Sequence, residues 1–195
     1  MTKRRAAVRR ETAETRIAAT LDLDGEGRAA VRTGLGFYDH LLTACARHGG
    51  FDLELTCEGD LEVDDHHTVE DCALALGAAI DEALGERRGI ARFGFAYAPL
   101  DEALARAVVD LSGRPFAAVD LGLRGLRLGE LAAENIDHAL RSLAVAARAT
   151  LHVDVLRGMN DHHRAEAAFK ALALALRMAV AATGSALVPS TKGVL

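Results

Sequence analysis

Hydrophobic and polar residues along the first half of the chain form patterns that predict strands and helices in turn. A long extended segment ends in the stretch rich in Asp and Gly from Asp22 to Gly27, which is typical of a turn, and a second extended segment follows it, so we expect a hairpin. Apolar residues recur at helical spacing from Val69 to Leu84. The predicted elements are strands over 8–23 and 29–33, a helix over 40–48, a strand over 51–57 and a helix that ends at 84.

Residues with known end preferences indicate where these helices begin and stop. Asp39 is suited to N-cap the first helix, and Gly49 and Gly50 are suited to end it. Thr68 and Asp71 have the spacing of a capping box at the start of the second helix. We therefore expect the first helix to begin at His40 and to end before Gly49, and the second to begin near Thr68.

The second half repeats this order of elements. Its predicted elements are strands over 90–98, 105–111 and 116–121, a helix over 136–149, a strand over 150–156 and a long helix that ends at 183. The repeat indicates an α+β fold of two duplicated halves, about 1–88 and 89–195, with the helices laid on one face of each mixed sheet. We expect the two halves to form a single catalytic domain.

Composition narrows the class of protein. The chain has 195 residues, half of them hydrophobic, and a net charge of -5, which makes a nucleic-acid partner improbable because such binding depends on neutralising phosphates. No apolar stretch has the length of a membrane span, and the basic segment from Met1 to Arg10 lacks the apolar core of a secretory signal. The cysteines, three in number, form no CxxC pair, as expected for reduced thiols. We expect a cytoplasmic protein without a membrane partner.

Histidines are concentrated in matched motifs. The pattern His-His-x-x-Glu begins at His66 and again at His162, and an Asp-His pair ending at His40 or His138 precedes each copy. Together these motifs contain six of the eight histidines. One isolated His-His pair is most often a surface or core pair, but two matched sets favour a site for a divalent first-row metal, with carboxylates shifting the preference toward harder ions such as Mn²⁺.

The spacing within each motif suggests how the ligands divide. If each motif opens a helix, the second histidine and the glutamate, at i and i+3, share a face, while the leading histidine points about 100° away and can serve a second metal. This groups His67 with Glu70 and His163 with Glu166. The zinc motif HExxH is absent.

Four long runs resemble the imidazoleglycerol-phosphate dehydratase family of histidine biosynthesis. They read Thr-Gly-Leu-Gly-Phe-Tyr-Asp-His over 33–40, Gly-Asp-Leu-Glu-Val-Asp-Asp-His-His-Thr-Val-Glu-Asp over 59–71, Asp-Leu-Ser-Gly-Arg-Pro over 110–115 and Pro-Ser-Thr-Lys-Gly-Val-Leu over 189–195. The resemblance covers nearly the whole chain. It implies a duplicated fold like the second domain of ribosomal protein S5, two Mn²⁺ ions per subunit at sites shared between subunits, and a homo-oligomer of twenty-four subunits built from trimers.

The resemblance also implies the ligands. By position they are His40, His66, His67, Glu70, His138, His162, His163 and Glu166. Pseudo-twofold symmetry suggests that one metal takes His40, His67, Glu70 and His162, and that the other takes His138, His163, Glu166 and His66.

The implied reaction is the dehydration of D-erythro-imidazole-glycerol phosphate to imidazole-acetol phosphate and water, by way of a metal-bound imidazolate. Glu14 is the candidate that moves the side-chain proton, and Glu70 and Glu166 are the other catalytic carboxylates. Family positions for the small-molecule phosphate substrate fall on Glu14, His40, His48, Arg92, Arg114, Lys170, Ser190 and Lys192. Without the resemblance, Glu14 would be interpreted as an exposed strand residue and the cations as surface charges. Phe95 departs from the family, which usually has His at this place.

The sequence permits two other interpretations. The stretch Asp22-Leu-Asp-Gly imitates the nucleophile loop of haloacid-dehalogenase-type phosphatases, but Glu26 replaces the expected Thr or Val and no second domain fits. A non-enzymatic metal-binding or RNA-binding module on an S5-like fold is the alternative from another class. Negative charge disfavours RNA, and a storage protein has no need of Arg92, Arg114 and Lys192 beside the ligands. Turnover that disappears with a chelator would distinguish the enzyme from the module.

Overall fold

The computed structural model describes residues 4–193 and 195. In chain order the described elements are β1 (Arg5–Glu11), β2 (Thr15–Asp22), β3 (Ala29–Arg32), α1 (Gly36–Gly49), β4 (Asp52–Gly59), α2 (His66–Leu84), β5 (Phe93–Leu100), β6 (Ala103–Asp110), β7 (Phe116–Asp120), β8 (Arg127–Leu128), β9 (Leu131–Ala132), α3 (Ala133–Ala146), β10 (Thr150–Arg157) and α4 (Asp161–Ala179). Among these elements no helix is long and apolar enough to cross a membrane.

The two halves have sheets of the same topology. The first sheet has the strand order β1-β2-β4-β3 and the second has β5-β6-β10-β7. In each sheet the last strand pairs in parallel with its neighbour, and the other pairs are antiparallel. The predicted duplication of an α+β half is therefore confirmed in the described residues. A short β8–β9 pair has no counterpart among the described residues of the first half.

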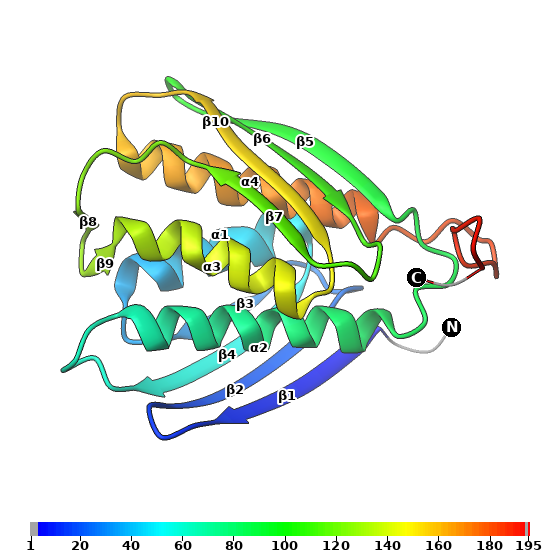
Figure 1. Cartoon of the computed structure of the whole chain (residues 1–195), viewed down its shortest axis with the longest axis horizontal. Helices are drawn as coiled ribbons and strands as arrows, with labels where there is room; N and C mark the ends of the chain where they lie inside the picture. Colours follow the sequence, from blue (N-terminus) through cyan, green and yellow to red (C-terminus); the bar gives the residue numbers. More distant parts are fainter. Residues whose placement is uncertain (1–3, 194) are drawn as a thin grey trace.

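Four helices fill the space between the two sheets (Figure 1). Helix α2 packs on β1 and β2, and α4 packs on β5 and β6. Each of these helices also contacts a helix of the other half, because α2 packs on α3 and α4 packs on α1. As predicted, the helices cover one face of each mixed sheet.

Small residues bring the helices close together. One connected core includes Leu55 of the first sheet, Val153 of the second and Leu172 of α4, all fully buried. A Cβ atom on Gly77 of α2 would lie 2.7 Å from the carbonyl oxygen of Leu143 in α3, so only glycine permits this approach. The alanine-rich helices thereby form one layer that supports the ligands of both halves.

The predicted first hairpin is wrong in its pairing. The hairpin consists of β1 and β2, which divide the region expected as a single strand over 8–23 and begin three residues before it, with the turn near Thr12. Strand β3 instead pairs in parallel with β4, after the chain has passed through α1. A turn-rich stretch marks the end of a strand but does not identify its partner, and a parallel pair needs a long crossover that local patterns do not report.

Three predicted helix ends are also wrong. Asp39 does not cap α1, which begins at Gly36; its carboxylate accepts hydrogen bonds from the backbone and hydroxyl of Thr33. Helix α2 begins at His66, so Thr68 lies inside it, and its buried hydroxyl has no partner among the described residues. Helix α4 ends at Ala179, before the expected 183, because Ala182 bridges to Ile90.

Candidate metal centres and substrate site

The two His-His motifs open α2 and α4, as expected. At α4, the side chain of Asn160 caps the helix by accepting hydrogen bonds from the backbone N–H groups of His162 and His163. At α2, Asp64 accepts from the backbone of His66, and the buried Asp65 accepts from Ala132 N at 2.6 Å. The bond to Ala132 ties the start of α2 to the start of α3, which brings ligands from distant parts of the sequence to one end of the helical layer (Figure 1).

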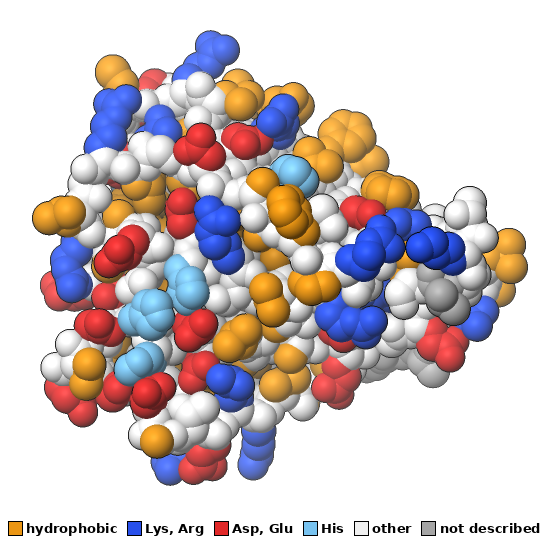
Figure 2. Space-filling model, in the orientation of Figure 1, with side chains coloured by type: hydrophobic (Ala, Val, Ile, Leu, Met, Phe, Trp, Pro, Cys, Tyr) orange, Lys and Arg blue, Asp and Glu red, His pale blue; other side chains and the backbone are white. Residues whose placement is uncertain are grey.

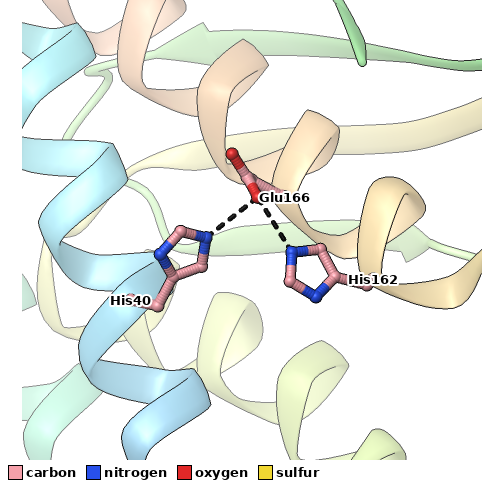
Figure 3. Close-up of side chains that lie close together, drawn as sticks. All are labelled: His40, His162 and Glu166. Carbon is pink, nitrogen blue, oxygen red and sulfur yellow. Dashed lines mark hydrogen bonds and ion pairs between the residues drawn. The ribbon is translucent and has the colours of Figure 1, made fainter. Parts of the chain in front are cut away.

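The first group of ligands, which we name the α4 cluster, consists of His40, His162 and Glu166. One carboxylate oxygen of Glu166 accepts from His40 Nε2 at 2.9 Å and from His162 Nε2 at 3.1 Å (Figure 3). Burial alone would raise the pKa of Glu166, but hydrogen bonds from His40 and Lys170 lower it to about 2. Two imidazoles thus point at one ionised carboxylate, and Phe37 lies beside His162, with ring centroids 4.9 Å apart.

The second group, the α2 cluster, consists of His66, Glu70 and His138. The rings of His66 and His138 stack with centroids 4.8 Å apart, and His138 Nε2 lies 3.2 Å from Glu70 Oε1. The buried Asn135 fixes His66 through Nδ1 at 3.1 Å. His138 Nε2 is buried, and despite its proximity to Glu70 it makes no hydrogen bond of acceptable geometry to a described residue.

The remaining two candidate ligands, His67 and His163, belong to neither cluster. His66 and His162 belong to the clusters whereas the histidines that follow them do not, which agrees with the predicted difference in direction. A hydrogen bond to Asp60 raises the pKa of His67. A hydrogen bond to Glu102 likewise raises the pKa of His163. The sequence did not indicate Glu102 or Asn135, because they are 61 and 69 residues from the histidines that they contact. Asp60 lies within the run over 59–71, but nothing in that run marked it as the partner of His67.

The ligand division expected from pseudo-symmetry differs from the arrangement within the chain. Glu166, not Glu70, lies with His40 and His162, and Glu70 lies with His66 and His138. The reason is helix geometry. Residues at i and i+4 are about 40° apart around the axis, closer than the 60° that separates i and i+3, so each glutamate faces the leading histidine of its motif.

Both clusters fit a divalent metal ion. Each offers two imidazoles and one carboxylate within a small volume, a donor set suited to divalent first-row ions. In the α4 cluster two N–H groups converge on one oxygen, and a cation can replace both protons. In the α2 cluster the buried Nε2 of His138, without a hydrogen bond, is a ready ligand atom.

The α4 cluster has neighbours suited to a polar substrate. Lys170, one turn along α4, contacts Glu166 Oε1 at 2.7 Å and is mostly buried. His48 is exposed on α1, and partial burial together with the charge of Lys170 lowers its pKa. Glu14, in the β1–β2 hairpin, lies 3.6 Å from His67 Nε2. The structure thus brings His40 and Lys170 together, with His48 nearby, whereas Glu14 accompanies His67.

The predicted phosphate-binding cations lie together, but far from the clusters. Arg92 forms a bidentate ion pair with Asp110 and donates to the Pro189 carbonyl, so its guanidinium is already occupied. Arg114 and Lys192 are exposed, and a Cβ on Gly113 would contact the backbone of Leu195, which places the Arg114 turn beside the C-terminal segment that includes Ser190. In Figure 2 a group of His side chains lies toward the left end of the molecule and a group of Lys and Arg side chains lies toward the right, with other His, Lys and Arg side chains elsewhere on this face.

Helix α4 gives the distance between these ends. The backbone N–H of Arg92 donates to the carbonyl of Ala179, the last residue of α4, whereas His162 is its second residue. At 1.5 Å per residue the two positions are about 25 Å apart. A small phosphorylated substrate cannot reach both ends of one chain. Phe95, the departure from the family pattern, is exposed on β5.

Comparison with known proteins agrees with the motifs and the fold. Residues 33–176 match the family model for imidazoleglycerol-phosphate dehydratase. The chain belongs to the imidazoleglycerol-phosphate dehydratase family. It is 58% identical to the enzyme of that name from Candida glabrata, over 97% of this chain and 99% of the relative. It is 52% identical to the one from Saccharomyces cerevisiae, over the full length of both.

Solved structures lead to the same family. The imidazoleglycerol-phosphate dehydratase from Pyrococcus furiosus, determined in complex with (S)-C348, is 39% identical and superposes with a TM-score of 0.84 over 96% of this chain and 100% of that one. The Staphylococcus aureus enzyme is 34% identical, with a TM-score of 0.83 over 92% of this chain and 99% of that one. The chain is therefore an enzyme, a dehydratase of histidine biosynthesis, and the resemblance inferred from sequence is confirmed.

Proposed function

We propose that the chain converts D-erythro-imidazole-glycerol phosphate to imidazole-acetol phosphate and water, using two Mn²⁺ ions per chain. The observation that carries this proposal is the pair of clusters, each with two histidines and one glutamate at one end of the helical layer. His40, His162 and Glu166 would hold one ion; His66, Glu70 and His138 would hold the other. We further propose that residues 1–195 act as a single catalytic domain of two halves in the cytoplasm, where reducing conditions suit its three free cysteines.

The clusters define what the chain must do in this reaction. When bound, two divalent ions supply Lewis-acid stabilisation of the charge that develops on the imidazole ring as the neighbouring hydroxyl leaves. Glu166 supplies a negative charge to the α4 cluster, and Glu70 supplies one to the α2 cluster. Lys170 offsets the charge of Glu166. Glu14 is half exposed, and among the described residues its ion-pair partner is His67 at 3.6 Å, so it is free to accept the proton from the substrate's side-chain carbon.

The separation of the cations from the clusters supports a site built from more than one chain. Arg114, Ser190 and Lys192 of one chain would bind the phosphate of a substrate whose ring lies at the clusters of another, since about 25 Å separates these ends within a chain. The exposure of the ligands supports the same arrangement: the side chains of His40 and His162 are 45% and 50% exposed. A homo-oligomer, twenty-four subunits built from trimers, is the assembly that we propose.

Metal analysis of the purified protein alongside the dehydratase assay tests the proposed function. We expect two divalent ions per chain, preferentially Mn²⁺, turnover that disappears with a chelator and returns with Mn²⁺, and an oligomer that loosens when the ions are removed, because binding energy held by the native assembly is stability. Full activity in a sample that holds one ion per chain or fewer would contradict the proposal.

Subunit mixing tests the shared site separately. Glu14→Gln and His163→Ala should each abolish activity when present in every chain. If a site takes these two residues from different chains, co-refolded mixed assemblies contain some sites with neither lesion, and a measurable part of the activity returns. Mass spectrometry of differently labelled chains verifies the mixing. No recovery in proven mixed assemblies would place both residues in one chain's site.

A further inference from the structure

His67 and His163, which lie outside the two clusters, are each hydrogen-bonded to a carboxylate. Each lies outside the clusters, yet each has its Nδ1 atom held by a carboxylate oxygen: His67 by Asp60 Oδ2 at 3.0 Å, and His163 by Glu102 Oε2 at 2.7 Å. A carboxylate at neutral pH carries no proton, so Nδ1 must be the donor in both bonds. Both imidazoles are therefore fixed in direction.

The two carboxylates come from different places in the fold. Asp60 directly follows β4, and its backbone is fixed by bonds to Glu14 and Val63. Glu102 lies in the β5–β6 hairpin, and its Oε1 accepts the backbone N–H groups of Met159 and Asn160, each at 2.9 Å. Glu14 precedes β2 as Glu102 precedes β6, but Glu14 lies beside His67 Nε2 and not Nδ1, so the two halves hold Nδ1 of their histidines through carboxylates at different positions.

Fixing Nδ1 as a donor leaves Nε2 of a neutral imidazole with its lone pair. In His67 this atom lies 3.6 Å from Glu14, and in His163 it lies 3.9 Å from Asp101, both in exposed surroundings. The side chains of His67 and His163 are 31% and 26% exposed, so another molecule can reach them. Histidines that bind metals in proteins characteristically donate their other nitrogen to a carboxylate.

We infer that Asp60 and Glu102 are positioning residues, which hold His67 and His163 in the orientation and tautomer that present Nε2 to a metal ion. The inference rests on the proposed function, because it assigns a purpose to histidines that the clusters of their own chain do not include. Neither carboxylate touches substrate or metal. Each acts only through its histidine.

The partners of the two carboxylates predict different responses to conversion into an amide. In Glu102→Gln the single remaining oxygen can accept hydrogen bonds either from Met159 and Asn160 or from His163. The amide N–H₂ group then faces the donors that the oxygen no longer accepts from. His163 can satisfy that N–H₂ only by moving its proton to Nε2, which removes the ligand atom. Asp60 Oδ1, by contrast, has no partner among the described residues, so Asp60→Asn can keep its oxygen on His67.

Binding of Mn²⁺ to metal-free protein, followed by the electron paramagnetic resonance signal of the free ion, tests the inference without an activity assay. Glu102→Gln should lower the affinity for one of the two ions about 10- to 100-fold, the usual effect of removing an outer partner of a metal ligand. Asp60→Ala should lower the affinity for the other ion to a similar degree. The affinity of Asp60→Asn should stay within about threefold of that of the unmodified protein. Glu58→Gln, an exposed change close to Asp60, is the matched control.

The outcomes separate this inference from the proposed function. If the unmodified protein binds no Mn²⁺, the proposed function fails, and the positioning role fails with it. If it binds two ions and Glu102→Gln and Asp60→Ala bind them equally well, only the positioning role is overturned. Should Glu102→Gln disturb folding, seen as a lower thermal midpoint of the metal-free protein, the difference between Asp60→Ala and Asp60→Asn still decides, since among the described residues His67 is the side-chain partner of Asp60 and no other is found.

Discussion

The α4 cluster and the α2 cluster have the same ligand types but different surroundings. In the α4 cluster Glu166 bonds two histidines and Lys170, while Phe37 covers one side. In the α2 cluster the position that corresponds to Lys170 is Leu74, and the position that corresponds to His48 on α1 is Ala146 on α3. The fixed polar contact there is Asn135 to His66.

This difference suggests a division of labour between two copies of one motif. The Lys170 ammonium beside Glu166 gives the α4 cluster a cation that the α2 cluster lacks, because the α2 cluster has only apolar residues at the same positions. The α4 cluster is therefore the better suited of the two to a polar substrate.

Removal of either cluster carboxylate should have the largest effect. Glu166→Gln and Glu70→Gln should each lower kcat/KM by more than about a hundredfold, because even the outer partners of metal ligands contribute 10- to 100-fold. Each variant should lose one ion per chain and keep the other, as measured by metal analysis in parallel with the assay. If Glu70→Gln retained activity with one ion, the α2 cluster would be structural, and the two clusters would differ in kind.

Lys170 and Leu74 give the sharpest comparison of the surroundings. Lys170→Met removes a mostly buried charge-assisted hydrogen bond to Glu166, which is worth about 1.5 to 3 kcal/mol, so kcat/KM should fall roughly ten- to a hundredfold. Leu74→Met conserves volume and apolar character, so it should change kcat/KM little. Equal losses in the two variants, at unchanged metal content, would show that the lysine has no special part.

The sequence predicts the features that repetition or helix periodicity determines. Two copies of His-His-x-x-Glu at matched places predict the duplicated fold, and helix geometry correctly predicts that adjacent histidines point in different directions. The pairing of β3 could not be predicted in this way, because its partner β4 follows only after α1. Strand partners depend on the packing of the whole sheet.

Contacts between distant residues also lie beyond the sequence patterns. Asn135 is 69 residues from His66, and Glu102 is 61 residues from His163, so no spacing connects either pair. The distance between the clusters and the cations around Arg114 likewise becomes visible only when α4 separates them in space. The sequence resemblance identifies the cluster ligands and these cations as site residues, but it identifies neither Asn135 nor Glu102. The separation of the clusters from the cations within one chain is the reason for proposing a site shared between chains.

The cations at the far end should have a smaller effect than Lys170. Arg114→Ala and Lys192→Ala should each raise KM about tenfold, the low end for a charge-assisted hydrogen bond, because both side chains are exposed to solvent. Metal content should stay at the level of the unmodified protein, in contrast to the cluster variants. Arg16→Ala, an exposed change on β2, serves as control. Loss of metal with an unchanged KM would move these residues out of the phosphate site.

The smallest effect compares the first residues of β4 and β10. Asp52 accepts hydrogen bonds from the side chain and backbone of Arg28 and from the backbone of Glu26, which together hold its pKa well below the ordinary value of 3.8. The side chain of the corresponding Thr150 donates one hydrogen bond to the Arg114 carbonyl.

A carboxyl whose pKa is lowered by folding stabilises the native state above its unfolded pKa, and that stability is lost as the pH falls below the unfolded pKa. Asp52→Asn should therefore lower the urea midpoint of the metal-free protein at pH 7, and its difference from the unmodified protein should shrink as the pH drops below about 4. Thr150→Val should have a smaller effect that does not change with pH. A constant Asp52→Asn difference from pH 7 to pH 3, at fixed protein concentration, would mean that the charge of Asp52 does not stabilise the first half.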